Sequence, residues 1–218
     1  MYDLKDSKGF TIIELLIVLG LMAMLLALSV PFVASLRSDI SLQKTLQGIK
    51  VDIVSTIDYS LAGKSFAALS ADDLTNPKLI PAAYALYFET DSDYGEQTPY
   101  KYLELASEEE GLDKAMKVSY EMPHEYSAPG VYLKDISFYN SDTGRNEKAD
   151  SGYIVVLPPF GKLLFVDDGE GFLSGLTEND FYQNQRDFNG IKLHFQYKDD
   201  ESTETVMSLN QGKVINIQ

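Results

Sequence analysis

Residues 10–36 read FTIIELLIVLGLMAMLLALSVPFVASL, and this stretch decides the fold. No charged side chain occurs between Leu15 and Val33. An α-helix rises about 1.5 Å per residue, so this uncharged segment would be about 28 Å long, close to the thickness of a bilayer's hydrocarbon core. It is longer than the apolar region of a cleaved secretory signal, and Ala34-Ser35-Leu36 is a poor cleavage site. We therefore expect a membrane-spanning helix over residues 10–35.

The helical pattern continues beyond the uncharged segment, over residues 36–62. Apolar residues recur at helical spacing, at Val33, Leu36, Ile40, Leu46, Ile49, Ile53, Ile57 and Leu61. Charged and amide side chains fill the positions between them, which predicts an amphipathic helix with one apolar stripe against a globular domain. Gly63 is the expected end, because glycine readily adopts the left-handed conformation that closes a helix. We expect one helix from about Phe10 to about Ala62.

Strand patterns replace the helical one over residues 63–218. Ala82–Thr90 is expected to be a strand, and Tyr100–Leu105 either a strand or a helical turn. Further strands are expected at Val131–Tyr139, Tyr153–Leu157, Lys162–Val166, Ile191–Tyr197, Thr205–Leu209 and Val214–Ile217. Asn210-Gln211-Gly212 predicts a hairpin turn between the last two. The expected class is α+β, a long N-terminal helix packed on a mainly antiparallel, meander-like sheet.

The composition argues against several classes of function. Asp and Glu number 33 against 18 Lys and Arg, which gives a net charge of −15. Broad nucleic-acid binding and peripheral binding to anionic lipid both need a basic face, so the composition argues against both and leaves room only for a small local basic patch. The chain has no cysteine and hence no disulfide or thiolate site. No catalytic triad, phosphate loop or carboxylate dyad stands out, so we expect a non-enzyme without a cofactor.

Glu14 places a carboxylate inside the apolar segment. A charge at the centre of a membrane helix costs about 2.5–3.5 kcal/mol on insertion scales, and less near the helix end. An ionisable group within a membrane segment is by default a candidate functional site that needs a partner. The alternative is that Glu14 lies in the interface, where the N-terminus of a helix tolerates an anion.

The context of Glu14 resembles the N-terminus of the type IV prepilins. Lys8-Gly9 precedes Phe10, Glu14 follows four residues later, and a Leu/Ile/Val run continues to residue 33. The resemblance implies a pilin-like fold, a leader peptide at residues 1–9, and cleavage between Gly9 and Phe10 by a prepilin peptidase. It also implies N-methylation of Phe10, and pairing of Glu14 with the N-terminal amine of a neighbouring subunit. The leader MYDLKDSKG departs from the family's pattern, because it is neutral where such leaders are usually basic.

Gly20 and Pro31 both fall within the predicted membrane helix. Both residue types are commoner in membrane helices than in soluble ones, which is one explanation for their presence. The other is local helix flexibility, because proline removes a backbone hydrogen bond and clashes with the preceding turn. Pro31 also stands where the resembling proteins often carry a helix-bending proline.

The C-terminal half more loosely resembles the H-type pseudopilins and the FimT-like minor pilins, in VVLPPFGKLLFV and TVMSLNQGKVINI. The resemblance implies a structural, minor subunit of a type IV pilus or a type II secretion pseudopilus. Its implied partners are the prepilin peptidase, other pilin or pseudopilin subunits and an inner-membrane assembly platform. Residues 63–218 would then lie outside the cytoplasm and, after assembly, in a filament. The alternative is a single-pass, membrane-anchored acidic ectodomain that acts as a binding module outside any filament.

Two oxygen-rich segments are weak candidates for calcium binding. The candidate ligands are Asp142, Asp150, Asp167 and Asp168. Calcium takes about six to eight oxygen ligands, and neither segment has the spacing of an EF-hand. Solvated turns are the preferred interpretation, and we expect no metal.

The two histidines are also expected to be structural. His124 lies in a proline-rich segment beside Glu125, and a single His–Glu pair does not make a metal site. His194 alternates with Lys192 and Gln196, which predicts three side chains on one exposed face of a strand.

Overall fold

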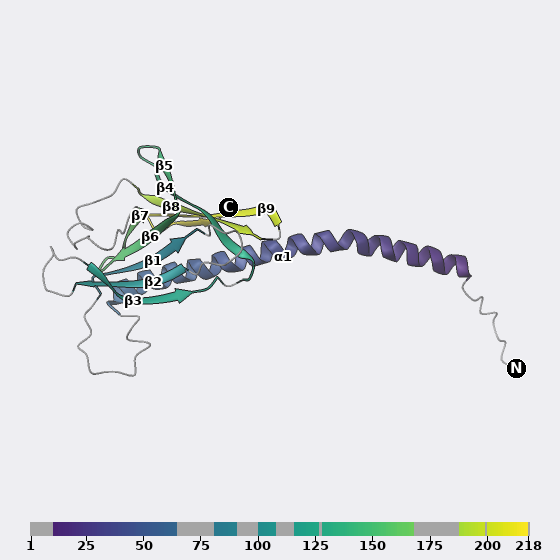
Figure 1. Ribbon diagram of the computed structural model, residues 1–218, viewed down its shortest axis with the longest axis horizontal. Helices are drawn as coiled ribbons and strands as arrows, with labels where there is room; N and C mark the ends of the chain where they lie inside the picture. Colours follow the sequence, from purple (N-terminus) through teal and green to yellow (C-terminus); the bar gives the residue numbers. More distant parts are fainter. Residues whose placement is uncertain are drawn as a thin grey trace, which may run out of the picture.

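The computed structural model describes residues 11–64, 81–90, 100–107, 116–126, 128–167, 188–198 and 200–217. In this part of the chain one long helix, α1 (Ile12–Ala62), precedes the strands. The strands are β1 (Ala83–Glu89), β2 (Tyr100–Ser107), β3 (Met116–His124), β4 (Val131–Asn140), β5 (Arg145–Ala149), β6 (Ser151–Leu157), β7 (Lys162–Asp167), β8 (Gly190–Tyr197), β9 (Asp200–Asn210) and β10 (Ile215–Ile217). The N-terminal half of α1 projects far from the strands, and its C-terminal half runs through the strand domain (Figure 1).

The described strands form two antiparallel sheets of five strands each. The first has the order β3-β2-β1-β6-β7 and the second the order β10-β9-β8-β4-β5. Every pair of neighbouring strands is antiparallel, which confirms the expected α+β class. Most neighbouring strands are consecutive in sequence, as the expected meander-like pattern implies, but the chain leaves the first sheet after β3, forms β4 and β5 in the second, and returns as β6 and β7.

Gly63 ends α1, as the sequence predicts. Its φ of 60° is in the left-handed region, where glycine carries no steric penalty. The amide of Lys64 donates to the Tyr59 carbonyl at 3.1 Å, so the last turn is closed by the backbone. The Tyr84 hydroxyl of β1 donates to the Lys64 carbonyl at 2.6 Å, which ties the helix end to the first sheet.

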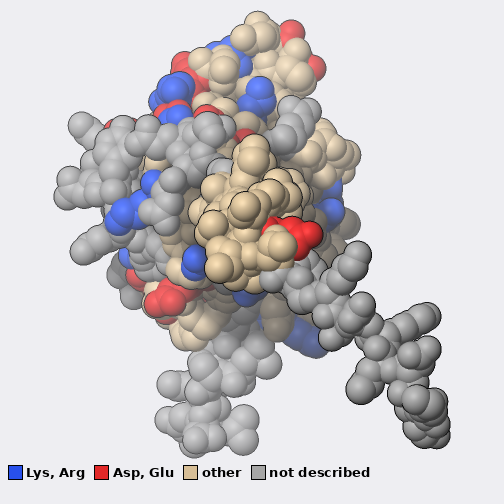
Figure 2. All heavy atoms as spheres, turned by 90° about the vertical axis from the view of Figure 1, so that its right-hand side faces the viewer, with Lys and Arg blue, Asp and Glu red and all other residues tan. Residues whose placement is uncertain are grey.

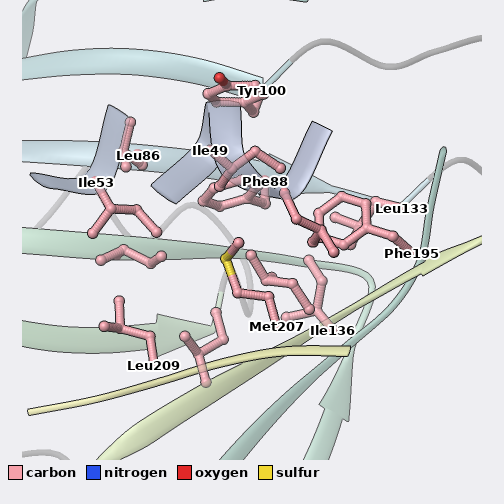
Figure 3. Packing of buried hydrophobic residues seen from close by; sticks show 14 of the residues in the cluster. Ile49, Ile53, Leu86, Phe88, Tyr100, Leu133, Ile136, Phe195, Met207 and Leu209 are labelled. Atoms are coloured by element: carbon pink, nitrogen blue, oxygen red, sulfur yellow. The ribbon is translucent and has the colours of Figure 1, made fainter. Parts of the chain in front are cut away.

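The C-terminal half of α1 supplies one wall of the hydrophobic core. Its buried apolar residues are Leu42, Leu46, Ile49, Ile53 and Ile57. The helix contacts β1 and β6 of the first sheet and β4, β8 and β9 of the second. Figure 3 shows Ile49 and Ile53 in one cluster with Phe88 of β1 and Met207 of β9. Burial of this stripe therefore holds the helix and both sheets together.

The ends of the predicted apolar stripe differ from the structure. Leu36, Ile40 and Leu61 are 43%, 64% and 50% exposed, whereas Leu42 is buried. Ile40 and Leu42 are two residues apart and so lie about 200° apart around the helix axis. A face that buries Leu42 must therefore expose Ile40.

Two strands were not predicted, β3 and β5. His124 is thus the last residue of a strand rather than part of a loop, and the segment between Asp142 and Asp150 contains β5 instead of being an oxygen-rich loop. Tyr100–Leu105, left open as strand or helical turn, is a strand. The Asn210-Gln211-Gly212 turn does connect an antiparallel pair, β9 and β10.

Candidate functional site: the projecting helix

The N-terminal half of α1 presents an uninterrupted apolar surface. Its large side chains are exposed on all sides, for example Leu15 at 55%, Leu25 at 68% and Phe32 at 65%. The helix is long and apolar enough to cross a membrane, and none of its most apolar stretch is buried within the chain. Figure 2 looks along this segment and shows almost no charged atoms on it apart from an acidic group. An apolar surface of this extent indicates contact with lipid or with other protein chains.

A capping box forms the N-terminus of α1. Thr11 is the N-cap, with φ −75° and ψ 152°, and its hydroxyl oxygen accepts a hydrogen bond from the Glu14 amide at 3.3 Å. The Glu14 carboxylate in turn accepts from the Thr11 amide and from the Thr11 hydroxyl, both at 2.9 Å. Our sequence interpretation missed this arrangement, although Thr11-x-x-Glu14 before an apolar run is its known signature.

The capping box gives Glu14 a partner within its own helix. The partners are a backbone amide and a hydroxyl, which are neutral, so the negative charge of the carboxylate is not balanced. Glu14 is also the only charged residue from Thr11 to Leu36. A cation supplied by another molecule would therefore find a fixed, oriented carboxylate at the tip of the projecting helix.

The other residues expected to act in the helix are placed as follows. Gly9 and Phe10 lie outside the described residues. Gly20 and Pro31 both lie within the continuous helix α1. A Cβ atom built on Gly20 would meet nothing within 4 Å, so no packing contact with the described residues requires a glycine there.

A polar cluster fixes the buried half of α1 to the first sheet. The Tyr100 hydroxyl of β2 donates a hydrogen bond to the Asp52 carboxylate of α1. His124 Nε2 of β3 lies 3.5 Å from Asp52 Oδ2, and the imidazole ring lies 5.1 Å from the Tyr100 ring. Burial, followed by the hydrogen bond to Asp52, raises the pKa of both Tyr100 and Tyr102. The C-terminal half of α1, from which the N-terminal half projects, is therefore firmly attached to the first sheet.

The two calcium candidates of the first segment, Asp142 and Asp150, are not brought together. Asp142 and Asp150 lie at opposite ends of β5, which separates them by roughly 20 Å of extended chain. The Asp142 carboxylate accepts from the Asn189 side-chain amide at 3.4 Å, as part of a turn. Asp167 ends β7, and Asp168 lies outside the described residues. Within the described ranges, no three His, Asp or Glu side chains gather as metal ligands would.

His194 is a partly exposed strand residue on β8, as predicted. Its Nδ1 lies 2.9 Å from Glu204 Oε1 on the neighbouring strand β9. This hydrogen bond is the largest cause of the lowered pKa of Glu204, and Lys134, at 3.3 Å, adds to it. Gln196, expected on the same exposed face, is instead buried and accepts a hydrogen bond from the Tyr132 hydroxyl at 2.8 Å.

One family description matches the chain, the prokaryotic N-terminal methylation motif, at residues 4–30. The match covers the predicted junction, the capping box and most of the projecting apolar helix, and it confirms the resemblance of this region that the sequence suggested. No curated protein and no solved structure matches the chain. The loose resemblance of the C-terminal half to particular subtypes therefore stays a prediction.

Proposed function

We propose that this chain, which carries the N-terminal methylation motif of the type IV prepilins and pseudopilins, is a structural subunit of a type IV pilus or type II secretion pseudopilus. One observation carries the proposal: the motif lies at the free end of a 51-residue helix whose first half is apolar and exposed. The same surface suits lipid before assembly and neighbouring helices after it. The loose resemblance of the C-terminal half to minor subunits favours a minor rather than a major position.

Processing is the first step of the proposed function. A prepilin peptidase would cut between Gly9 and Phe10, and the new amino group of Phe10 would be methylated. Glycine at the bond suits a peptidase that works beside a membrane helix, because a bulky side chain there would obstruct approach to the peptide. Cleavage would leave Phe10 directly before the N-cap Thr11, four residues from Glu14.

Assembly is the second step, and Glu14 is its proposed centre. The carboxylate at the helix tip keeps its charge unbalanced within the chain, and a methylated ammonium on Phe10 of a neighbouring subunit would balance it. Gly20 lies on an open helix surface, where a missing side chain lets another helix approach closely. Flexibility at Gly20 and Pro31 would allow the helix to adjust during packing.

The strand domain would remain outside the cytoplasm as the exposed head of the subunit. Its expected partners during assembly are other pilin or pseudopilin subunits and an inner-membrane platform. The proposed role is structural and requires no catalytic centre or cofactor. Within this role Asp52 and Tyr100 keep the head attached at a set position on the helix.

The test is mass spectrometry of the mature N-terminus after expression with the filament machinery. A chain that begins with methylated Phe10 and appears in the sheared-filament fraction is the expected result. A chain that retains Met1 and stays in the membrane fraction would instead support the alternative, an anchored ectodomain outside any filament.

A further inference from the structure

The outer face of the second sheet carries a hollow of about 590 Å³. It lies over β4, β5, β8 and β9, on the face opposite the core. Alternation along the strands explains this placement: Ile136 and Phe138 of β4 point into the core, whereas Ser137 and Tyr139 line the hollow. The volume lies in the range of small-molecule sites.

A row of paired residues crosses the floor of the hollow. Ser137 of β4 is paired with Lys148 of β5 on one side and with Lys192 of β8 on the other, and Lys192 is paired with Ser208 of β9. Directly paired residues of antiparallel strands project from the same face, with Cβ atoms about 5 Å apart. A lysine side chain therefore stands on each side of Ser137, which is itself buried beneath them, and Ser208 follows beyond Lys192.

Tyr139 holds the ammonium group of one of these lysines in place. Tyr139 is paired with Gly190, and a Cβ atom on Gly190 would lie 2.1 Å from Tyr139 Cζ. The ring can lie across β8 only because residue 190 has no side chain. Lys192 Nζ lies 5.4 Å from the centre of this ring, at cation–π distance. Gly190 and Tyr139 thus form a shaped floor under the Lys192 ammonium.

The hollow is positively charged in a strongly acidic chain. Lys148 and Lys192 line it, and among the described residues no carboxylate does, although the chain has a net charge of −15. Arg145 and His194 also line it, but Arg145 pairs with Glu147 at 2.7 Å and His194 with Glu204 at 2.9 Å. Lys148 pairs with Asp135 at 3.2 Å, but its side chain is 73% exposed, and such pairs are weak. No carboxylate among the described residues lies within ion-pair distance of Lys192.

The net charge restricts the size of an anion that the hollow can take. A polyanion would extend beyond the cationic row and meet the repulsion of the acidic surface. A small anion stays within a few ångströms of the cations, well inside the screening length of about 8 Å at physiological salt. The Ser208 hydroxyl and the amide of Asn146, which is paired with Tyr139, add hydrogen-bonding groups for a hydroxylated molecule.

We propose that this hollow binds a small hydroxylated anion that carries one or two carboxylate or phosphate groups, such as a sugar acid or a sugar phosphate. Lys148 and Lys192 hold the anionic group across Ser137, and the Asn146 amide of β5 takes a hydroxyl group of the ligand. The proposal does not depend on assembly into a filament.

The test is calorimetric titration of the full chain in neutral detergent micelles with glucuronate, glucose 1-phosphate and glucose. We expect at least one of the two anions to bind with a dissociation constant below about 1 mM, and glucose to bind at least about tenfold more weakly. Glucuronate alone would identify the group as a carboxylate, and glucose 1-phosphate alone as a phosphate. Raising the salt concentration should weaken either interaction.

Lys101 offers a matched control for Lys192. It too lies over a tyrosine ring, 5.8 Å from the centre of Tyr87, but on the first sheet, where it pairs with Glu121 at 2.8 Å. Lys192→Gln should weaken anion binding about tenfold or more, as loss of a charge-assisted contact does, and Lys101→Gln should leave it unchanged. Binding of neither anion, equal binding of glucose, or an equal effect of the two substitutions would overturn the proposal. So would binding of polyglutamate without binding of either small anion, because the site would then recognise an acidic polypeptide.

Discussion

The Tyr100 hydroxyl donates a hydrogen bond to the Asp52 carboxylate, and this contact joins β2 to α1 across 48 residues of sequence. The contact lies beside the buried stripe of the helix: Ile53 directly follows Asp52 in the chain, and Ile49 lies one turn earlier. The stripe holds the helix against the sheets through apolar contact, which is not directional. The directional bond from Tyr100 adds a preferred rotation and height of the helix relative to the first sheet.

Replacement of Asp52 should therefore destabilise the head. Asp52→Ala leaves the buried Tyr100 hydroxyl without its acceptor, which should cost about 1–3 kcal/mol of unfolding free energy. Thermal unfolding of the full chain in detergent, followed by near-ultraviolet circular dichroism, measures the change. Asp58→Ala, at an exposed position of the same helix, is the control and should stay within about 0.5 kcal/mol of the parent. Equal effects of the two changes would assign no special role to Asp52.

The tyrosine cluster predicts a loss of stability at alkaline pH. The pKa values of Tyr100 and Tyr102 are raised above the ordinary value of 10.0, so the folded chain keeps phenolic protons that the unfolded chain releases. This contribution to stability is complete below about pH 10 and declines as the pH rises above it. Tyrosinate absorbance and circular dichroism should therefore change together above pH 10 for the buried tyrosines. Ionisation of all 14 tyrosines near pH 10 in a chain that stays folded would contradict the assignment.

Ile53 tests whether the helix is part of the core. Its side chain is fully buried, so Ile53→Asp places an unpaired charge among apolar groups and should destabilise the head by about 3–5 kcal/mol. Val51, two residues earlier, is 61% exposed, and Val51→Asp should have little effect. Denaturation of both variants in urea under the same detergent conditions compares them. A similar loss in the Val51 variant would mean that the helix packs in another orientation.

The long helix could be predicted because its signals are local. Uncharged length, amphipathic spacing and Gly63 at the end all lie within residues 10–63, and the structure places the helix at Ile12–Ala62. The strands of sheet interiors were likewise predicted from their apolar content. The two missed strands, β3 and β5, are both at sheet edges. β3 contains Pro123, which an edge strand tolerates and an interior strand does not, and β5 is polar except for Ala149.

The candidate sites likewise divide into those with a local sequence signal and those that depend on contacts between distant residues. Glu14 could be recognised from the sequence because its neighbours in the chain make it unusual. The contact of Asp52 with Tyr100 joins positions far apart in sequence, and neither residue type is unusual where it stands. The row of Lys148, Ser137 and Lys192 depends on how β4 is aligned with β5 and with β8. A single sequence does not specify this register for strands that are far apart along the chain, as β4 and β8 are.

Processing at the predicted junction is tested by Gly9→Val. A branched side chain beside the cleaved bond should block the peptidase, so the variant should accumulate about 1 kDa heavier, the mass of the uncut leader. Gly9→Ala, which adds a single methyl group, should be cut at a rate closer to that of the parent. Immunoblotting and intact-mass measurement after expression with the peptidase distinguish the forms. Normal maturation of Gly9→Val would show that the junction lies elsewhere.

The last prediction separates two roles of Glu14, capping the helix and presenting a charge. Glu14→Gln keeps an oxygen that can accept from the Thr11 amide but removes the charge, whereas Glu14→Val removes both. Membrane insertion should be unchanged or improved in both variants, because loss of a charge lowers the cost of transfer into lipid. Cleavage should persist in both, since Gly9 is untouched.

If the charge of Glu14 meets the Phe10 amine of a neighbouring subunit, both variants should fail to enter the sheared-filament fraction, or enter it slowly. The reason is that the ammonium group of the incoming subunit would enter an apolar environment without a carboxylate to pair with. In the glutamine variant the helix cap is kept, but the cap carries no negative charge. If Glu14 serves only to cap the helix, Glu14→Gln should assemble like the parent and only Glu14→Val should be impaired. Assembly of both variants at the parent's level would remove Glu14 from the mechanism and favour the membrane-anchored ectodomain.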